Sequence, residues 1–211
     1  MIKTTHITDG VRKILEVSSI YQSLQNLVGG ESSRIRHVEE NIRPHSHSRI
    51  LDIGCGPAAI LNCLPDSVQY VGYDLNPRYI ASAKKRYGSR GTFFCERVGL
   101  DLSRKITGSF DRVIASGLLH HLCDEDAESV FSTAWSLLDA GGTLVTLDTV
   151  HTVNGHWLSK FITSQDRGQN TRTPEGYLKI AHAKFSHVEG HVTTRLTRIP
   201  HYTLYIMRCT K

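Results

Sequence analysis

The chain has 211 residues, of which 39% are hydrophobic and 21% charged, and its formal net charge is +5 at pH 7. This composition excludes a collagen-like, disordered or disulfide-scaffold protein and indicates a globular domain with an ample core. The positive charge is not gathered into a run of Lys and Arg, so we expect no dedicated nucleic-acid binding.

The first ten residues lack the apolar core of a signal peptide, and no later stretch approaches membrane-spanning length. The five cysteines are odd in number and unclustered, which indicates reduced thiols in the core. His45 and His47 lie in the polar run RPHSHS with no third ligand nearby, so no metal site is predicted. We therefore expect a cytoplasmic protein with no membrane contact.

Two helical patterns come first in the chain. Over 11–28 apolar residues recur at helical spacing until a pair of glycines ends the pattern. The more charged segment 31–43 is the second pattern, and RPHSHS then connects it to the following region. We expect residues 1–48 to form an N-terminal helical lid or extension, followed by the main domain over 49–211.

Short apolar runs alternate with helical patterns from residue 49 onward. Expected strands lie near 49–53, 69–73, 92–95, 110–115 and 142–148, and expected helices near 57–64, 77–87 and 124–139. In the last of these helices, Asp124 and Asp126 offer caps, and Gly141 and Gly142 are expected to stop it. The alternation predicts an α/β fold with a doubly wound, mostly parallel sheet, whose ligands bind beyond the carboxyl ends of the strands.

The segment from Thr149 to the end departs from this alternation. Its first part, about 149–184, is polar and irregular around two helical patterns at 153–163 and 174–183, and we interpret it as an insertion on the acceptor side. Two strand-like runs follow, at 186–199 and 202–209. Because their separation is too short for a crossover helix, these two strands must pair antiparallel.

The segment ILDIGCGPAAI over 50–60 is the most informative part of the chain. A buried strand runs into a turn that carries Gly54 and Gly56, so bare backbone can come close to a ligand. Asp74 follows a second strand, twenty residues after Gly54. A carboxylate at that position can accept hydrogen bonds from both hydroxyls of a ribose. The pattern predicts a site for an adenosine.

Four motifs in order resemble the class I S-adenosylmethionine (SAM)-dependent methyltransferases, of the type 11/12-like group, over about 49–211. They are LDIGCGP, YVGYDLNP, FDRVIASGLLHHL and LLDAGGTLVTLD. One such match would be weak, but four in the right order are specific. The resemblance implies a seven-stranded sheet with an antiparallel last strand, and SAM as cofactor, with S-adenosylhomocysteine as its product.

The resemblance also implies a set of cofactor contacts. The acid in the first motif, Asp52, should engage the amino-acid end of the cofactor, and Asp74 the ribose. The third strand is less regular: Val98 should pack on the adenine, and its polar contact stays open between Glu96, Arg97 and Asp101. The full set of expected cofactor residues is Tyr21, Gln25, Asp52, Gly54, Cys55, Gly56, Asp74, Leu75, Glu96, Arg97, Val98, Ser116 and Gly117. Tyr21 and Gln25 lie one turn apart on the N-terminal helix, which similar enzymes fold over the cofactor.

Candidates for the chemistry follow the fourth and fifth strands. An imidazole or a carboxylate there could remove a proton from an alcohol acceptor during methyl transfer. The candidate bases are His120, His121, Asp148, His151 and His156. The candidate acceptor-binding residues are Asp166, Arg167, Arg172 and Tyr177, and the arginine forks would suit an acidic substrate.

These features predict methylation of a small molecule or a sugar-containing intermediate, most readily at oxygen, with nitrogen and carbon open. Two alternatives remain at this point. A non-catalytic protein that binds SAM or S-adenosylhomocysteine would share the same cofactor motifs. A nicotinamide-dependent oxidoreductase would share the glycine pattern, although Asp52 would repel its pyrophosphate. The oligomeric state is also open, including a homodimer.

Overall fold

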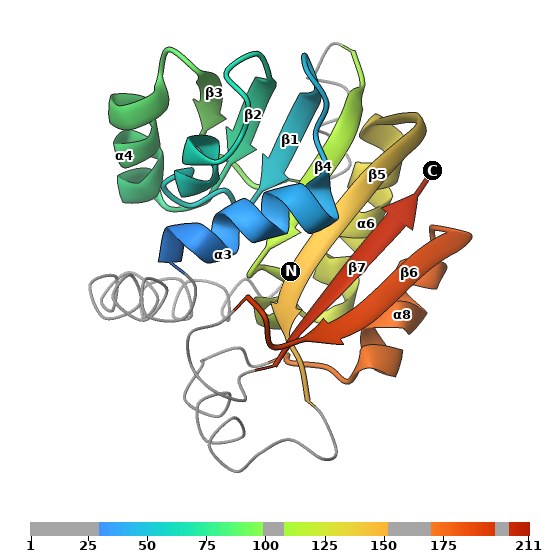
Figure 1. The fold of residues 1–211 in the computed structure, drawn as a ribbon. Helices are drawn as coiled ribbons and strands as arrows, with labels where there is room; N and C mark the ends of the chain where they lie inside the picture. The colour runs from blue at the N-terminus through green and yellow to red at the C-terminus, as the bar shows by residue number, and fades with distance from the viewer. Residues whose placement is uncertain (1–29, 99–107, 152–169, 197–202) are drawn as a thin grey trace, which may run out of the picture.

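The computed structural model describes residues 30–98, 108–151, 170–196 and 203–211. Within them, the chain forms one seven-stranded sheet in the order β3-β2-β1-β4-β5-β7-β6 (Figure 1). The strands are β1 (Arg49–Ile53), β2 (Gln69–Tyr73), β3 (Gly91–Phe94), β4 (Phe110–Ser116), β5 (Leu138–Thr149), β6 (His187–Thr193) and β7 (Leu204–Thr210).

The first five strands are parallel, while β7 runs antiparallel to β5 on one side and to β6 on the other. This arrangement confirms the predicted doubly wound sheet and its antiparallel last strand. Since β1, β2, β4 and β5 run in the same direction, the segments that follow them meet at one edge of the sheet. The predicted site residues of the first, second, fourth and fifth strands all lie at that edge.

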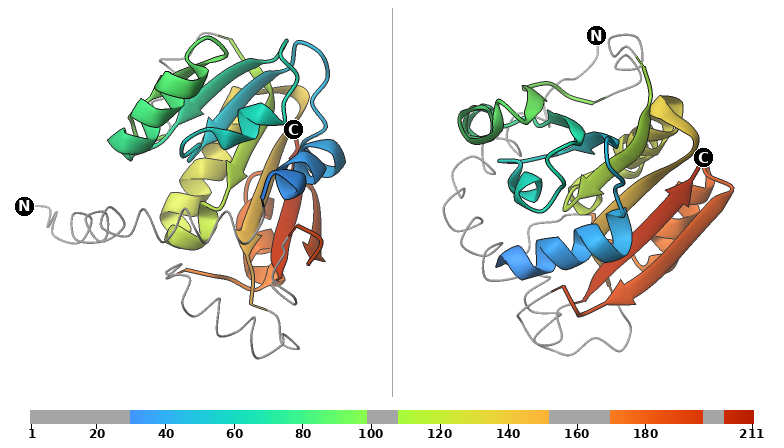
Figure 2. Two further views of the ribbon diagram at one scale, coloured as in Figure 1. Left: turned by 60° about the vertical axis from the view of Figure 1, so that its left-hand side comes forward. Right: turned by 45° about the horizontal axis from the view of Figure 1, so that its top comes forward.

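Helices cover both faces of the sheet. α3 (Gly30–His37) lies in front of the sheet in Figure 1, and α6 (Asp124–Leu137) and α8 (Pro174–His182) lie behind it; Figure 2 shows the same layers from two other sides. Each face has its own buried cluster. One joins the turn η1 (Val38–Ile42) that follows α3, α4 (Pro77–Tyr87) and even-numbered side chains of β1 and β2, and the other joins α6, α8 and odd-numbered side chains of the same strands. The buried residues of η1 and of α6 therefore lie in different clusters.

The predicted helix over 57–64 is wrong. The structure has only a 3-10 turn, η2 (Ala59–Asn62), after the glycine turn. Ala58 has a left-handed backbone conformation with φ of 56°, from which an α-helix does not propagate, and Pro65 follows one residue beyond the expected end. The apolar residues here do pack as expected, since Ala58 and Leu61 are fully buried.

The helix predicted over 124–139 is two residues shorter than expected. α6 ends at Leu137, and β5 begins at Leu138 without a connecting loop. The expected acid caps are absent as well, because Cys123 is the N-cap residue and makes no side-chain capping bond. The glycine pair lies inside β5, where the pairing register with β4 shifts and Gly141 takes φ of 76°. The glycines therefore form a bulge instead of a helix stop.

The charged segment predicted as helical over 31–43 is confirmed. α3 continues into one π-helical turn, η1 (Val38–Ile42), which ends at Arg43 with φ of 50°. Arg112 and Arg208 donate hydrogen bonds to the carbonyl oxygens of Ile42 and Asn41, which fixes this turn to β4 and β7. The helices predicted over 11–28 and 153–163 lie outside the described residues.

No helix in the described part of the chain is long and apolar enough to cross a membrane. All five cysteines are free thiols, but only Cys209 is fully buried, whereas Cys95 and Cys123 are exposed. The expectation that the cysteines are core residues is therefore wrong for those two.

Candidate active site

The turn after β1 is held by backbone hydrogen bonds to β2. The amides of Gly54 and Cys55 both donate to the carbonyl oxygen of Tyr73, at 2.8 and 2.9 Å. Gly54 takes φ of 76°, and a Cβ placed on it would lie 3.2 Å from the side chain of Leu118, so both conformation and packing require glycine. A Cβ on Gly56 would meet nothing within 4 Å. The glycine at 56 thus borders open space, as a cradle for a ligand requires.

Asp74, at the end of β2, ties this turn to the next helix. One carboxylate oxygen accepts from the amide of Gly56 at 2.9 Å, and the other from the amide of Asn76 at 2.7 Å. Asn76, not Asp74, caps α4, because its side chain accepts from the amide of Arg78. Burial raises the pKa of Asp74, and the two amides lower it. Each oxygen keeps a second lone pair, so the carboxylate can still accept from a ribose.

Asp52 is the buried acid at the end of β1. It lies opposite Gly72 in the β1–β2 register, is 5% exposed, and accepts a 2.5 Å hydrogen bond from the Tyr70 hydroxyl. Burial raises the pKa of Asp52 to about 7, the bond from Tyr70 lowers it, and the charge of Asp74 raises it. The carboxyl group therefore changes its charge near neutral pH.

The residues expected around the adenine differ in burial and in their contacts. Val98 is half-buried and packs against the core cluster of α6, while Leu75 directly after Asp74 is 55% exposed. Arg97 forms an ion pair with Asp126 on the first turn of α6. Glu96 is exposed, and Asp101 lies outside the described residues. The polar adenine contact stays open, and an exposed Leu75 is available as an apolar one.

Ser116 and Gly117 follow β4 beside the glycine turn. The amide of Gly117 donates to the carbonyl oxygen of Leu147 at 2.7 Å, and Gly117 has φ of 69° with nothing within 4 Å of an added Cβ. The Ser116 hydroxyl is buried and has no hydrogen-bond partner among the described residues. An open glycine beside a buried hydroxyl without a protein partner fits a ligand at this position.

The structure brings together two of the candidate bases. The Nδ1 atom of His120 lies 2.9 Å from Oδ1 of Asp148, and the His120 amide donates to the same oxygen at 3.3 Å. Both side chains are buried, at 3% and 2% exposed. The His121 ring lies with its centroid 4.0 Å from that of His120 and is only half-buried. The carboxylate therefore orients His120, with Nδ1 as the protonated nitrogen and Nε2 as the basic one.

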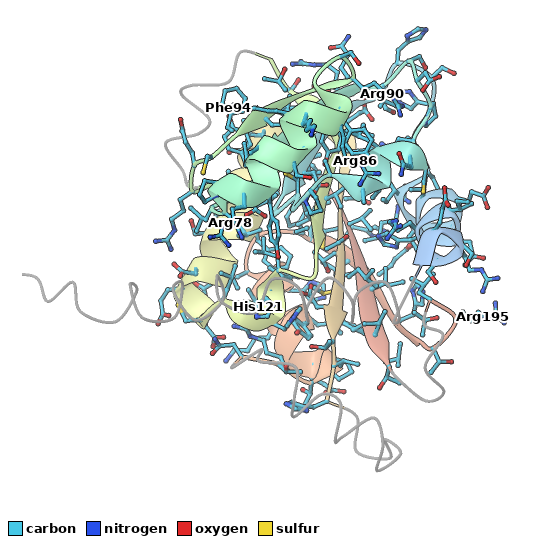
Figure 3. All side chains as sticks on the ribbon, turned by 90° about the vertical axis from the view of Figure 1, so that its left-hand side faces the viewer. Arg78, Arg86, Arg90, Phe94, His121 and Arg195 are labelled. Atoms are coloured by element: carbon cyan, nitrogen blue, oxygen red, sulfur yellow. The ribbon has the colours of Figure 1, made fainter. Side chains whose placement is uncertain are left out.

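Figure 3 shows the elements from which the outer side chains of this edge come. Arg78 extends from the first turn of α4, Phe94 from the end of β3, and His121 from η3 (Leu119–His121), the 3-10 turn after β4. Phe94 stacks on Tyr73 with ring centroids 4.8 Å apart.

Arg172 was predicted to bind the acceptor, and its geometry argues against that role. Its guanidinium pairs with Asp124 and donates to the carbonyl oxygens of Leu119, Leu122 and Asn170. All the nitrogens of the fork are used by protein groups, so none is left to clamp a carboxylate. Arg172 instead joins η3, and with it His120, to the segment that begins at Asn170.

Tyr177 was also predicted to bind the acceptor, but its side chain is 1% exposed in the core. Its hydroxyl donates to the carbonyl oxygen of Thr149 at 2.9 Å, and its ring stacks on Tyr205. The Tyr205 hydroxyl in turn occupies the space that a Cβ on Gly190 of β6 would take. We interpret Tyr177 as a support for the end of β5.

Of the other candidates, one is exposed and the rest lie outside the described residues. His151 is exposed directly after β5, and its amide donates to the carbonyl oxygen of Arg172. Outside the described residues lie Tyr21, Gln25, His156, Asp166 and Arg167. No group of three metal-ligating side chains is found in the part of the chain that the structure describes.

Sequence reasoning missed Tyr70 and Leu118. Tyr70 lies two residues before Gly72, the partner of Asp52, so it is on the same face of the neighbouring strand. The strand register would have revealed this pair. Leu118 lies inside the third motif, and only the approach of two turns in the structure reveals its contact with the position of a Cβ on Gly54.

Part of the chain matches a known protein family. Residues 51–144 match the family model of the methyltransferase domain Methyltransf_12. A comparison with curated protein sequences finds no match.

Solved structures share the fold at low identity. The plantazolicin methyltransferase BamL, in complex with a triazolic desmethylPZN analog and S-adenosylhomocysteine, has a TM-score of 0.69 at 17% identity, covering 93% of this chain and 90% of that chain. The TehB-like SAM-dependent methyltransferase from Corynebacterium glutamicum has a TM-score of 0.65 at 17% identity, covering 93% and 99%. The N-methyltransferase NodS from Bradyrhizobium japonicum WM9, with bound S-adenosylhomocysteine, has a TM-score of 0.63 at 16% identity, covering 86% and 87%.

The match to a methyltransferase domain and the antiparallel β7 favour the methyltransferase interpretation over the oxidoreductase alternative. Residues 51–144 therefore resemble a methyltransferase domain, and the described sheet has the fold of the solved SAM-dependent methyltransferases to which it is similar.

Proposed function

We propose that the protein methylates a hydroxyl group of a small molecule or a sugar-containing intermediate. The observation that carries this proposal is the buried pair of His120 and Asp148 at the edge of the sheet where the cofactor motifs meet. An alcohol loses its proton during methylation, and a carboxylate-oriented imidazole can take it near neutral pH.

Cofactor binding is assigned to residues after three neighbouring strands. Gly56 and Gly117 offer backbone without side chains, Ser116 offers a buried hydroxyl, and Asp74 offers carboxylate lone pairs to a ribose. Asp52 offers its negative charge to the ammonium group of the methionine end. When bound, SAM supplies a methyl group on an already activated sulfonium.

The protein's remaining tasks are to position the acceptor, to exclude water and to remove the proton. Positioning of reactants can account for roughly 7 to 11 kcal/mol of a barrier in favourable cases. In the proposed arrangement Asp148 holds His120 through Nδ1, so that Nε2 receives the proton. His121, the more exposed ring of the two, is the alternative base. We assign the reaction to the cytoplasm, and a homodimer stays a prediction.

Transfer of a tritiated methyl group from SAM into fractions of a cell extract tests this proposal. We expect label in a small-molecule fraction, bound through an alkali-stable ether. Label on an amine or on carbon would retain the enzyme class and reject the hydroxyl. Tight SAM binding with no label in any fraction would favour the second candidate, a non-catalytic SAM-binding protein.

A further inference from the structure

Tyr70 carries a role that no motif assigns to it. Its hydroxyl donates to Asp52 at 2.5 Å, and both side chains are buried, at 2% and 5% exposed. Tyr70 is held from two sides, because its ring packs against Phe93 and lies where a Cβ on Gly91 would come within 3.0 Å. A tyrosine fixed in this way cannot easily turn its hydroxyl away from the carboxyl group.

The chemistry around Asp52 makes this donor important. Burial disfavours the carboxylate, and the neighbouring Asp74 disfavours it further, while Tyr70 is the one group among the described neighbours of Asp52 that favours it. The Cys55 thiol also faces the acid, and burial raises its pKa, so it stays neutral. Burial and the charge of Asp52 raise the pKa of Tyr70 as well, so the phenol keeps its proton and remains a donor.

We propose that Tyr70 is a positioning residue, whose hydroxyl orients the Asp52 carboxyl group and keeps it ionised to receive the ammonium group of the cofactor. This inference rests on the proposed cofactor site. It predicts that the cofactor is bound through a charge whose presence at physiological pH depends on one phenol.

The sign of the effect follows from the two protonation states. A hydrogen bond from Tyr70 stabilises the carboxylate, so its removal raises the pKa of Asp52 above about 7. The protonated acid then persists to higher pH and cannot attract an ammonium group. The pH at which cofactor affinity is half lost should therefore move upward by about one unit, the shift expected for a hydrogen bond to a charged group.

The experiment measures S-adenosylhomocysteine affinity by calorimetry between pH 6 and 8.5 for the wild type, Tyr70→Phe, Asp52→Asn and the double variant. We expect Tyr70→Phe to bind roughly fivefold more weakly at pH 7, because the ionised fraction of Asp52 falls there from about one half to about one eleventh, and to approach the wild type at the alkaline end. In the Asp52→Asn background, Tyr70→Phe should change nothing further, because Tyr70 acts through the acid. The cofactor's own titration is common to all four proteins and cancels in their comparison.

Tyr87→Phe is the matched control. Tyr87 is also buried, at 6% exposed, and its hydroxyl also donates to a side-chain oxygen, that of Asn62, at 2.9 Å. Because this acceptor is a neutral amide, removal of the hydroxyl should leave the pH profile in place. If Tyr70→Phe behaves like Tyr87→Phe, or loses affinity equally at every pH, Tyr70 is a packing residue and the inference is wrong.

A second measurement follows the free protein and needs no cofactor. The carboxyl carbon of Asp52, observed by NMR in the wild type and in Tyr70→Phe, should titrate at a higher pH in the variant. An unchanged midpoint together with cofactor binding would overturn the inference alone. A wild type that binds no cofactor at any pH would overturn the proposed function, and the proposed role of Tyr70 toward the cofactor with it.

Discussion

The two halves of the site are held by different kinds of hydrogen bond, one mainly through backbone amides and the other mainly through side chains. At the β1–β2 edge, the glycine turn, the Tyr73 carbonyl and Asp74 are joined through backbone amides within 25 residues of sequence. At the β4–β5 edge, His120 is held by Asp148 and its turn by Arg172, which lies 48 residues beyond Asp124. A nucleoside site can be made from local backbone geometry, whereas a proton-transfer site here depends on side chains from distant segments. The predictions below test this division.

The largest expected effect is on catalysis at the second half. His120→Ala should lower the methyl-transfer rate by about 100-fold or more, because general base catalysis typically contributes that much. His121→Ala is the comparison variant, since its ring is adjacent to that of His120 but more exposed. Tritium transfer and calorimetry check this, and cofactor affinity should stay within twofold for both. Equal, undiminished rates would remove both histidines from the chemistry.

The next effect is on stability at the same edge. Arg172→Leu should destabilise the fold by about 2–3 kcal/mol, because it leaves the carbonyl oxygens of Leu119 and Leu122 without their donor. Denaturant unfolding measures the loss, with Arg90→Leu as a control arginine that also donates to carbonyl groups but lies in the first half. The two variants should lose similar stability, yet only Arg172→Leu should lower turnover. A weaker cofactor affinity in Arg172→Leu would contradict the division.

A smaller effect is expected on cofactor affinity in the first half. Asp74→Ala should weaken SAM binding at least tenfold, which corresponds to about 1.4 kcal/mol. Asp66→Ala is the control, because that carboxylate is exposed and pairs only with Arg90 among the described residues. Calorimetry checks both variants. An Asp74→Ala protein with unchanged affinity would refute the ribose assignment.

The smallest effect separates strain from ligand contact. Gly56→Ala and Gly141→Ala both place alanine at positive φ with nothing within 4 Å of the new Cβ. Each should therefore cost a similar 1 kcal/mol or so of stability. Only Gly56→Ala should weaken SAM binding, because only that glycine borders the proposed cradle. A thermal melt and a binding titration on the same samples decide this, and parallel losses of affinity would place the cradle elsewhere.

The predictable parts of the molecule are those set by local pattern. The strand after residue 49, the turn at Gly54 and Gly56, and the acid at 74 all follow from short-range periodicity and glycine chemistry. The predicted helix over 57–64 was wrong because the spacing of apolar residues carries no information about the left-handed backbone conformation of Ala58. The predicted end of α6 was wrong because a pair of glycines can either end a helix or form a bulge in a strand.

Contacts between side chains from distant segments could not be predicted from the sequence either. Nothing near Arg172 in sequence indicates that four protein groups would use its fork. Tyr177 was expected at the acceptor, but the structure buries it, and its hydroxyl donates to the carbonyl oxygen of Thr149. Tyr70 became visible only through strand register. Such pairings depend on which segments the topology brings together, and a single sequence does not record this.

The lack of a side chain at Gly190 limits which residues can replace it. Any larger residue there must push aside the Tyr205 hydroxyl, whose ring rests on Tyr177, the residue that donates to the last carbonyl of β5. A substitution on the outermost strand, far from every cofactor motif, therefore reaches the segment that carries Asp148. In a mutational scan for activity, position 190 should be as intolerant as a buried one, although its own surface faces water.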